Sequence, residues 1–448
     1  MFIVLLQYIV SNFKSIGHPV EFSMFPSEGN LDERFLKTLS THSNGTLKVL
    51  RRGGFFGPNA SGKSSFIESI AFARDFVVNG RKSGKGTKIN QFKGNFSDLE
   101  GLSTFQFVFY LDERVYEYGF SVDRQQVHEE WLLELMDSDF VTLFTRATDR
   151  FGKTEIDIEP SFAPVDSAER RLAEVLKATV QENQRNQLFL YKLFDNGIKR
   201  AEHIVEWFTN LQIILPSTKV IALPLRMKEN EDLQKYISEM LCRMDTGVSN
   251  VSVASEKMDL HDFAEKMHIP KEIIEDIENI SSGSVTIDGQ NFVFIDGKEK
   301  GPVVVRQTFE HMLNGHAEPF DIEEESDGTQ RLLDLLPMLY SIRENKNLIY
   351  FVDEIDRSLH TKLSQFLLSE FANNCEDTNN QIIFTAHDVN LINTDSFRQE
   401  EIWFIDKNRL GESYLRSLSD FNLQDGQNAL KAYLNGRFGA IPTIRRRC

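Results

Sequence analysis

GPNASGKS, residues 57–64, is the stretch of sequence that decides the fold. It matches the pattern G-x-x-x-x-G-K-[ST] at every fixed position, after an apolar run and at the start of an apolar-periodic helix. Glycines in such a loop let backbone N–H groups turn inward around phosphates, and the helix start adds positive potential. The motif therefore predicts a phosphate-binding loop; a glycine-rich turn that happens to contain lysine and serine is the alternative.

The motif also predicts which side chains bind the nucleotide. We expect Lys63 to reach the β- and γ-phosphates of ATP, and the Ser64 hydroxyl to bind Mg²⁺. Gly53 and Gly54, just upstream, are expected only to mark a bend before a short strand. The predicted nucleotide-binding loop consists of Gly57, Pro58, Asn59, Ala60, Ser61, Gly62, Lys63, Ser64 and Ser65.

A phosphate loop needs an acidic partner, and NLIYFVDEID, residues 347–356, supplies one. Apolar residues predict a strand that ends in Asp353 and Glu354. We expect Asp353 to hold Mg²⁺ and Glu354 to polarise the attacking water. An apolar strand that ends in Asp-Glu is common by chance, so the assignment depends on its position after a complete phosphate loop.

A second phosphate-binding device precedes the acidic strand. Ser326 and Gly328 open an apolar-periodic helix, and a helix N-terminus attracts phosphate. Because the chain has one phosphate loop, the natural ligand of this pair is a γ-phosphate in another subunit. Each candidate also has a plainer interpretation: Ser326 as a helix N-cap, Asp356 as a solvated carboxylate, and His387 at the end of QIIFTAH as a surface histidine.

This order of motifs resembles that of the ABC-type ATPases. The resemblance implies that SDGTQ, residues 326–330, is a variant of the ABC signature, with Asp327 where many ABC proteins have glycine. It implies that Asp356 is the D-loop aspartate and that His387 is the switch histidine, which contacts the γ-phosphate. Gln91 is the candidate for the Q-loop glutamine, which would contribute to the metal site.

Both ends of the chain carry a further resemblance. NFKSIG, residues 12–17, is similar to the start of RecF- and SMC-type heads. LRSLSDF (415–421) and YLNGRFGAIP (433–442) look like compact bacterial ATPases labelled AAA-family, such as the ATPase subunits of the Septu and PARIS anti-phage systems. The resemblance implies a homodimer or larger homo-oligomer formed around ATP. It also implies a separate effector, a nuclease or Toprim-type protein, with DNA or a phage protein as the trigger.

The expected fold is α/β: an ABC-ATPase head with a mixed sheet and a β-rich N-terminal lobe, interrupted by a mostly helical insertion. About 290 residues separate Lys63 from Asp353, so the insertion must be large. We expect the first half of the head over 1–165, a helical lobe with a β-hairpin over 166–319, and the second half over 320–448. The absence of sustained heptads favours a compact head over a long-armed SMC-type protein.

Composition limits the function. The formal net charge of −17 argues against a protein that coats DNA with its whole surface. Three scattered cysteines fit a reducing cytoplasm, and no apolar run is long enough for a membrane span. We expect a cytoplasmic, ATP-hydrolysing switch in anti-phage defence, with a RecF-like DNA-repair or clamp ATPase as the alternative. No intrinsic nuclease is expected: the resemblance implies that a nuclease would be a Toprim domain after the ATPase, and only about 60 residues follow His387.

Overall fold

The structure is a computed structural model. It describes residues 1–27, 35–42, 45–82, 84–94, 101–136, 139–149, 151–163, 167–220, 222–257, 262, 265, 283–287, 291–295, 303–344, 346–375, 378–392, 396–421 and 429–441. The chain forms two compact units. The first contains Met1–Pro216, Asn345–Asp356 and Phe371–Cys448, and the second contains Ser217–Glu344 and Arg357–Glu370.

The first unit begins with a seven-stranded antiparallel sheet in the order β10-β9-β8-β7-β6-β1-β2. Its strands are mostly nine residues long, and alternating inward positions are aromatic, as expected for a sheet with one face on a core. The strands are β1 (Ile3–Ser11), β2 (Val20–Ser23), β6 (Ser103–Leu111), β7 (Arg114–Val122), β8 (Val127–Leu135), β9 (Phe140–Thr148) and β10 (Thr154–Ile158). A separate hairpin pairs β3 (Leu36–Ser40) with β4 (Thr46–Leu50).

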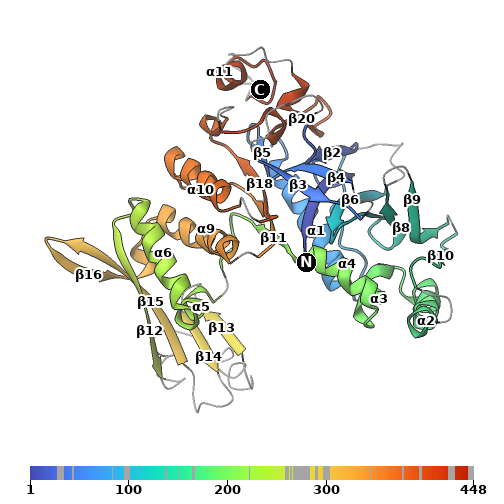
Figure 1. Cartoon of the computed structure of the whole chain (residues 1–448), viewed down its shortest axis with the longest axis horizontal. Coiled ribbons are helices and arrows are strands. Elements are labelled where there is room, and N and C mark those ends of the chain that lie inside the picture. The colour runs from blue at the N-terminus through green and yellow to red at the C-terminus, as the bar shows by residue number, and fades with distance from the viewer. Residues whose placement is uncertain are drawn as a thin grey trace. The chain divides into compact units, whose positions relative to one another are not determined.

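The second sheet of this unit has the order β11-β17-β18-β5-β19-β20. All neighbours are parallel except β19 and β20, which form an antiparallel hairpin. Strands far apart in sequence therefore pair side by side, with β5 between β18 and β19. Figure 1 labels β5, in blue, beside β18. Its strands are β5 (Arg52–Phe56), β11 (Leu211–Ile214), β17 (Ile349–Val352), β18 (Gln381–Ala386), β19 (Ile402–Lys407) and β20 (Ser413–Ser417). The expected α/β class, with a β-rich N-terminal lobe and a second, mixed sheet, is confirmed.

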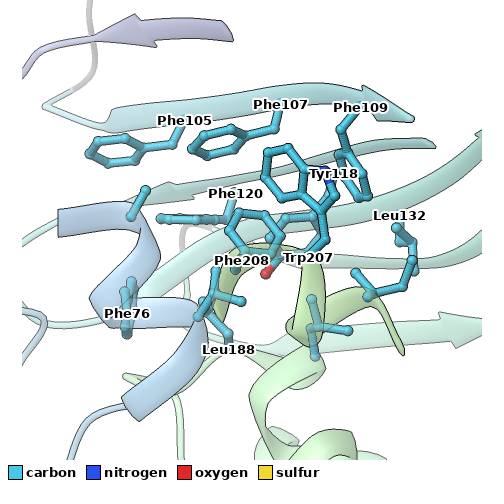
Figure 2. Close-up of a cluster of buried hydrophobic side chains, with 14 of the residues drawn as sticks. Phe76, Phe105, Phe107, Phe109, Tyr118, Phe120, Leu132, Leu188, Trp207 and Phe208 are labelled. Atoms are coloured by element: carbon cyan, nitrogen blue, oxygen red, sulfur yellow. The ribbon is translucent and has the colours of Figure 1, made fainter. Parts of the chain in front are cut away.

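An aromatic core joins the antiparallel sheet to the helices of the first unit (Figure 2). Phe109 on β6 stacks on Trp207 with ring centroids 4.4 Å apart, and Phe107 meets Phe208 edge-on at 5.2 Å. Phe76 contributes from the helix that follows the phosphate loop. Such ring pairs add about 0.5–1.5 kcal/mol each beyond the area they bury. The helices of this unit are α1 (Lys63–Asn79), α2 (Ala168–Asn183), α3 (Phe189–Asp195), α4 (Lys199–Thr209) and α11 (Ala429–Leu434), with 3-10 turns η2 (Val389–Leu391), η3 (Gln399–Glu401) and η4 (Leu418–Asp420).

The helices α2 to α4 belong to the first compact unit, although the sequence assigns them to the insertion. Ala173, Leu193 and Trp207 are fully buried in the core of the first unit, whereas the sequence ranges place the whole of 166–319 in the insertion. The boundary between the two compact units falls after Pro216. An amphipathic helix reveals that it has a buried face, but not which core covers that face.

A buried ion pair fixes α3 on the antiparallel sheet. Glu130 on β8 accepts hydrogen bonds from the backbone N–H groups of Phe189 and Leu190, at 2.6 and 2.9 Å, and from the Tyr118 hydroxyl at 3.1 Å. Arg146 on β9 lies 3.8 Å from the same carboxylate. Burial raises the pKa of Glu130, and the Arg146 guanidinium opposes that rise.

The second unit is more β-rich than the single hairpin that the sequence predicts. Its antiparallel sheet has the order β12-β15-β14-β13, and β16 pairs with β15. The strands are β12 (Val248–Lys257), β13 (Gly283–Ile287), β14 (Asn291–Ile295), β15 (Val303–Leu313) and β16 (His316–Phe320). The helices are α5 (Leu223–Glu229), α6 (Glu231–Arg243), η1 (Ile322–Glu324) and α9 (Asp327–Arg343), while α10 (Thr361–Asn374) crosses the boundary after Glu370. Among the described helices of both units, none combines the length and apolarity that crossing a membrane requires.

Candidate nucleotide site

The phosphate loop joins the end of β5 to the start of α1, as the sequence predicts. Two of its glycines touch neighbouring groups too closely for any side chain. A Cβ on Gly57 would lie 2.1 Å from the carbonyl oxygen of Ile405. A Cβ on Gly62, whose φ is +115°, would lie 2.1 Å from the Ser413 hydroxyl. The loop is therefore shaped by its packing against the β19–β20 hairpin.

The predicted bend at Gly53 and Gly54 is absent, because both glycines lie within strand β5. A Cβ on Gly53 would approach the Phe22 ring to 2.8 Å, and one on Gly54 would approach the Phe384 ring to 2.7 Å. The two glycines therefore let aromatic rings from β2 and β18 pack directly on the backbone of the central strand.

A cavity of about 640 Å³ opens beside the loop. The residues that line it come from the predicted phosphate loop and from the ends of β17 and β18, together with Ser15 and Lys407, which the sequence does not assign to the site. They are Ser15, Asn59, Ala60, Ser61, Gly62, Lys63, Ser64, Ser65, Glu354, His387 and Lys407. Gly57 and Pro58 stand behind this wall and meet the lysine of the loop through their carbonyl groups.

Lys63 is held in the loop by its own backbone. Its ammonium group donates to the carbonyl oxygens of Gly57 at 2.7 Å and Pro58 at 3.1 Å, and the residue is only 5% exposed. Burial lowers the pKa of Lys63, and the carboxylates of Asp353, Asp356 and Glu354 act in the opposite direction. The cavity thus has a desolvated cation at its base, within the field of three acids.

A buried threonine organises the two acidic residues at the end of β17. The Thr385 hydroxyl on β18 donates to Asp353 Oδ1 at 2.6 Å and accepts from the backbone N–H of Glu354 at 2.8 Å. Glu354 has a φ of +50°, a left-handed conformation that costs free energy in a non-glycine residue. Its side chain meets His387 Nε2 at 3.2 Å. The predicted base and the predicted switch histidine are therefore in direct contact.

Asp356 is placed to orient His387. Its Oδ2 accepts hydrogen bonds from the backbone N–H groups of His387 and Asp388, at 2.8 and 2.5 Å. The carboxylate therefore has a role within its own chain, and it is not among the residues that line the cavity. Its D-loop role across a subunit boundary remains a prediction.

The oxygen ligands expected for Mg²⁺ are present at the site. Asp353 offers a buried carboxylate and Ser64 a hydroxyl at the cavity wall, which is the kind of hard oxygen donor that Mg²⁺ takes beside phosphate oxygens. Gln91 lies elsewhere: its amide donates to the carbonyl oxygen of Gly101, and it does not line the cavity. Within the described ranges, no group of three or more His, Cys, Asp or Glu residues is arranged to hold a metal ion by itself.

The predicted signature belongs to the second unit. Ser326 is the N-cap of α9, and its hydroxyl accepts from the backbone N–H of Thr329 at 3.1 Å. A Cβ on Gly328 would lie 2.9 Å from the carbonyl oxygen of Ser358, so glycine is required for this close approach. The capping role of Ser326 is thus present in the structure, and phosphate binding in a second subunit remains a prediction.

The structure adds residues that the motifs do not reveal. Thr385 lies two positions before His387 in QIIFTAH. Its place near the end of an apolar strand, like that of Asp353, is the sequence signal that could have identified it. Ser15 belongs to the NFKS turn, whose Asn12 and Lys14 have positive φ values. Lys407 and Ser413 carry no sequence signal, because only the pairing of β19 with β5 brings them to the loop.

Comparison with known families agrees with this geometry. Residues 54–393, more than half of the chain, match the model of a family described as "AAA domain, putative AbiEii toxin, Type IV TA system". The chain belongs to this family. It is therefore a P-loop ATPase of the AAA-domain kind, which confirms the expected ATPase class at that level.

Three of the solved structures that match the chain are SMC heads, at low similarity. An SMC head bound to the C-terminal winged-helix domain of ScpA has 14% identity and a TM-score of 0.40, with 93% of this chain and 98% of that chain covered. The SMC head domain from Thermotoga maritima has 12% identity and a TM-score of 0.33, with 93% of this chain and 99% of that chain covered. The Smc head domain with an extended coiled coil, bound to the C-terminal domain of ScpA from Pyrococcus furiosus, has 13% identity and a TM-score of 0.37. The match covers 97% of this chain and 100% of that chain. No curated protein matches the chain.

Proposed function

We propose that this AAA-domain protein is a nucleotide-gated switch, which binds Mg²⁺–ATP at the cavity beside the phosphate loop and hydrolyses it. The observation that carries the proposal is the contact between Glu354 and His387 at the wall of a cavity whose base holds Lys63. One bound nucleotide would then contact three groups. Glu354 would act as the base for water, His387 would sense the terminal phosphate, and Lys63 would bind the phosphates.

The chain's own groups define the chemistry. When a triphosphate enters, Lys63 exchanges two neutral carbonyl partners for anionic oxygens, and hydrogen bonds between charged groups are the stronger kind. Glu354 accepts a proton from the attacking water, and His387 donates a hydrogen bond to the γ-phosphate. Asp353 and Ser64 would hold Mg²⁺, which would supply positive charge to the phosphates.

We further propose that ATP joins two copies of the chain. Ser326 and Gly328 of one copy would contact the γ-phosphate bound to the other copy, and the same patch would act in both directions in an isologous dimer. Asp356 would lie at this interface. Hydrolysis would remove the γ-phosphate that both copies share, and so would release the dimer.

The biological role that we propose is regulation of a defence or toxin system, with a separate effector protein. The family description, which names a toxin and a toxin–antitoxin system, supports this role. The effector would be a nuclease or Toprim-type protein, and DNA or a phage protein would trigger the switch.

Nucleotide binding tests the proposed chemistry first. Fluorescent ATP should bind the wild-type chain, and Lys63→Ala should abolish binding, because the cation at the base of the cavity is lost. Glu354→Gln should keep binding and lose turnover. Wild-type protein that neither binds nor hydrolyses ATP would contradict the proposal.

Co-purification from the native host tests the proposed role. A tagged chain should bring down an effector nuclease or Toprim-type protein in stoichiometric amount. Recovery of replication or repair proteins together with DNA would instead favour a RecF-like clamp.

A further inference from the structure

Lys407 lines the same cavity as the phosphate loop, although no motif includes it. It is the last residue of β19, which pairs in parallel with β5 through Phe404 and Phe56. One residue further along, the carbonyl oxygen of Ile405 lies against Gly57. The start of the phosphate loop and the end of β19 are therefore in backbone contact.

Pairing with β20 brings Lys407 close to the middle of the loop as well. Lys407 is opposite Ser413 in the β19–β20 register. The Ser413 hydroxyl donates to the carbonyl oxygen of Ser61 at 2.6 Å, and it lies within hydrogen-bond distance of the Ser15 hydroxyl, at 2.8 Å. The position of Lys407 is thus set by two strand pairings and by a serine that is bonded to the loop.

The strand order shows which end of the nucleotide Lys407 faces. β17 and β18, which supply Glu354 and His387, lie on one side of β5, and β19 and β20 lie on the other. The groups for hydrolysis mark the side of the γ-phosphate. The opposite side of the loop must therefore face the nucleoside end of the ligand, where the α-phosphate is.

The charge environment of Lys407 leaves its ammonium group available to a ligand. The residue is exposed, and among the described residues its side chain makes no ion pair. The neighbouring carboxylate of Asp406 is engaged elsewhere, with the backbone N–H groups of Lys407 and Ala440 and with the Tyr414 hydroxyl. The lysine is therefore a cation at the wall of the cavity that the phosphate loop lines.

We propose that Lys407 is a second phosphate-binding lysine, which contacts the α-phosphate of the nucleotide. The inference rests on the proposed function, because it assumes that the cavity holds a nucleoside triphosphate. It assigns a new residue to that site and a distinct part of the ligand to that residue.

An α-phosphate contact is made equally to ATP and ADP, and it changes little as the γ-phosphate leaves. Loss of the contact should therefore weaken the binding of both nucleotides by the same factor, about tenfold for a single hydrogen bond to a charged group. Such uniform binding affects KM and leaves kcat unchanged. Lys407→Arg should retain most of the affinity, because it keeps the positive charge.

The test is titration of wild type, Lys407→Ala, Lys407→Arg and Arg409→Ala with fluorescent ATP and ADP, together with steady-state ATPase assays. Arg409 is the control because it is exposed on the same hairpin but does not line the cavity. We expect a tenfold rise in Kd for both nucleotides and in KM for Lys407→Ala alone.

Three results would overturn the inference. Unchanged affinity in Lys407→Ala, with normal binding by wild type, would reject the lysine and leave the proposed function intact. A loss confined to ATP would place the contact at the γ-phosphate. Wild-type protein that binds neither nucleotide would reject both the inference and the proposed function.

Discussion

Thr385→Val tests whether the hydroxyl between the two acidic residues sets up hydrolysis. Thr385 is fully buried, and valine replaces its hydroxyl with a methyl group of similar size. The change removes a donor at 2.6 Å from Asp353 and the acceptor for the backbone N–H of Glu354 at 2.8 Å. A hydrogen bond to a charged group contributes about 1.5–3 kcal/mol. If this contribution is expressed in the transition state, kcat should fall roughly ten- to hundredfold, since about 1.4 kcal/mol corresponds to a factor of ten.

The assay is steady-state phosphate release at saturating Mg²⁺–ATP, with nucleotide affinity measured separately. Affinity should change little, because Thr385 does not line the cavity. Thr385→Ser is the matched control: it keeps the hydroxyl and should keep most of the rate. Wild-type turnover in Thr385→Val would refute the reasoning, and so would an equal loss in Thr385→Ser.

Three further predictions concern the scaffold. Gly62→Ala should abolish nucleotide binding, because the added Cβ would clash with the Ser413 hydroxyl. Gly411→Ala is the control, since Gly411 also has a positive φ but lies in open space. This variant should lower the free energy of unfolding by only about 1 kcal/mol and leave nucleotide binding unchanged. Arg146→Met should lower the free energy of unfolding by about 3–5 kcal/mol, measured by urea titration, because it leaves a buried carboxylate without its cation; a loss below about 1 kcal/mol would contradict the pairing. Burial raises the pKa of Cys375 to about 12, so mass spectrometry after native alkylation at pH 8 should find exposed Cys242 modified and Cys375 intact; modification of Cys375 would contradict its burial.

Much of the nucleotide site could be predicted from the sequence because its motifs are local. The phosphate loop is contiguous, and Asp353 and Glu354 close one apolar strand. Parallel strands bring their carboxyl ends to the same edge of the sheet, so His387 on the neighbouring strand also lies at the cavity. The contact between Glu354 and His387 follows from that rule.

Other features depend on pairings that no local pattern contains. Lys407 reaches the cavity only because β19 pairs with β5 across more than 340 residues of sequence. The sequence predicts a bend at Gly53 and Gly54, because the aromatic rings that pack on them come from distant strands and leave no local signal. Likewise, β12 (Val248–Lys257) pairs with β15 (Val303–Leu313). These strands are far apart in sequence, so the sequence pattern does not predict the sheet of the second unit.

The mass of Glu354→Gln in solution tests the central claim, that ATP joins two chains, most directly. Light scattering during size exclusion should give the 51.6 kDa of one chain without nucleotide. With Mg²⁺–ATP, which this variant binds but does not hydrolyse, the mass should double or increase further. Ser326→Arg, which would place a bulky side chain at the predicted trans contact, should stay monomeric while still binding ATP. An unchanged mass for Glu354→Gln at saturating ATP would contradict the nucleotide-gated dimer.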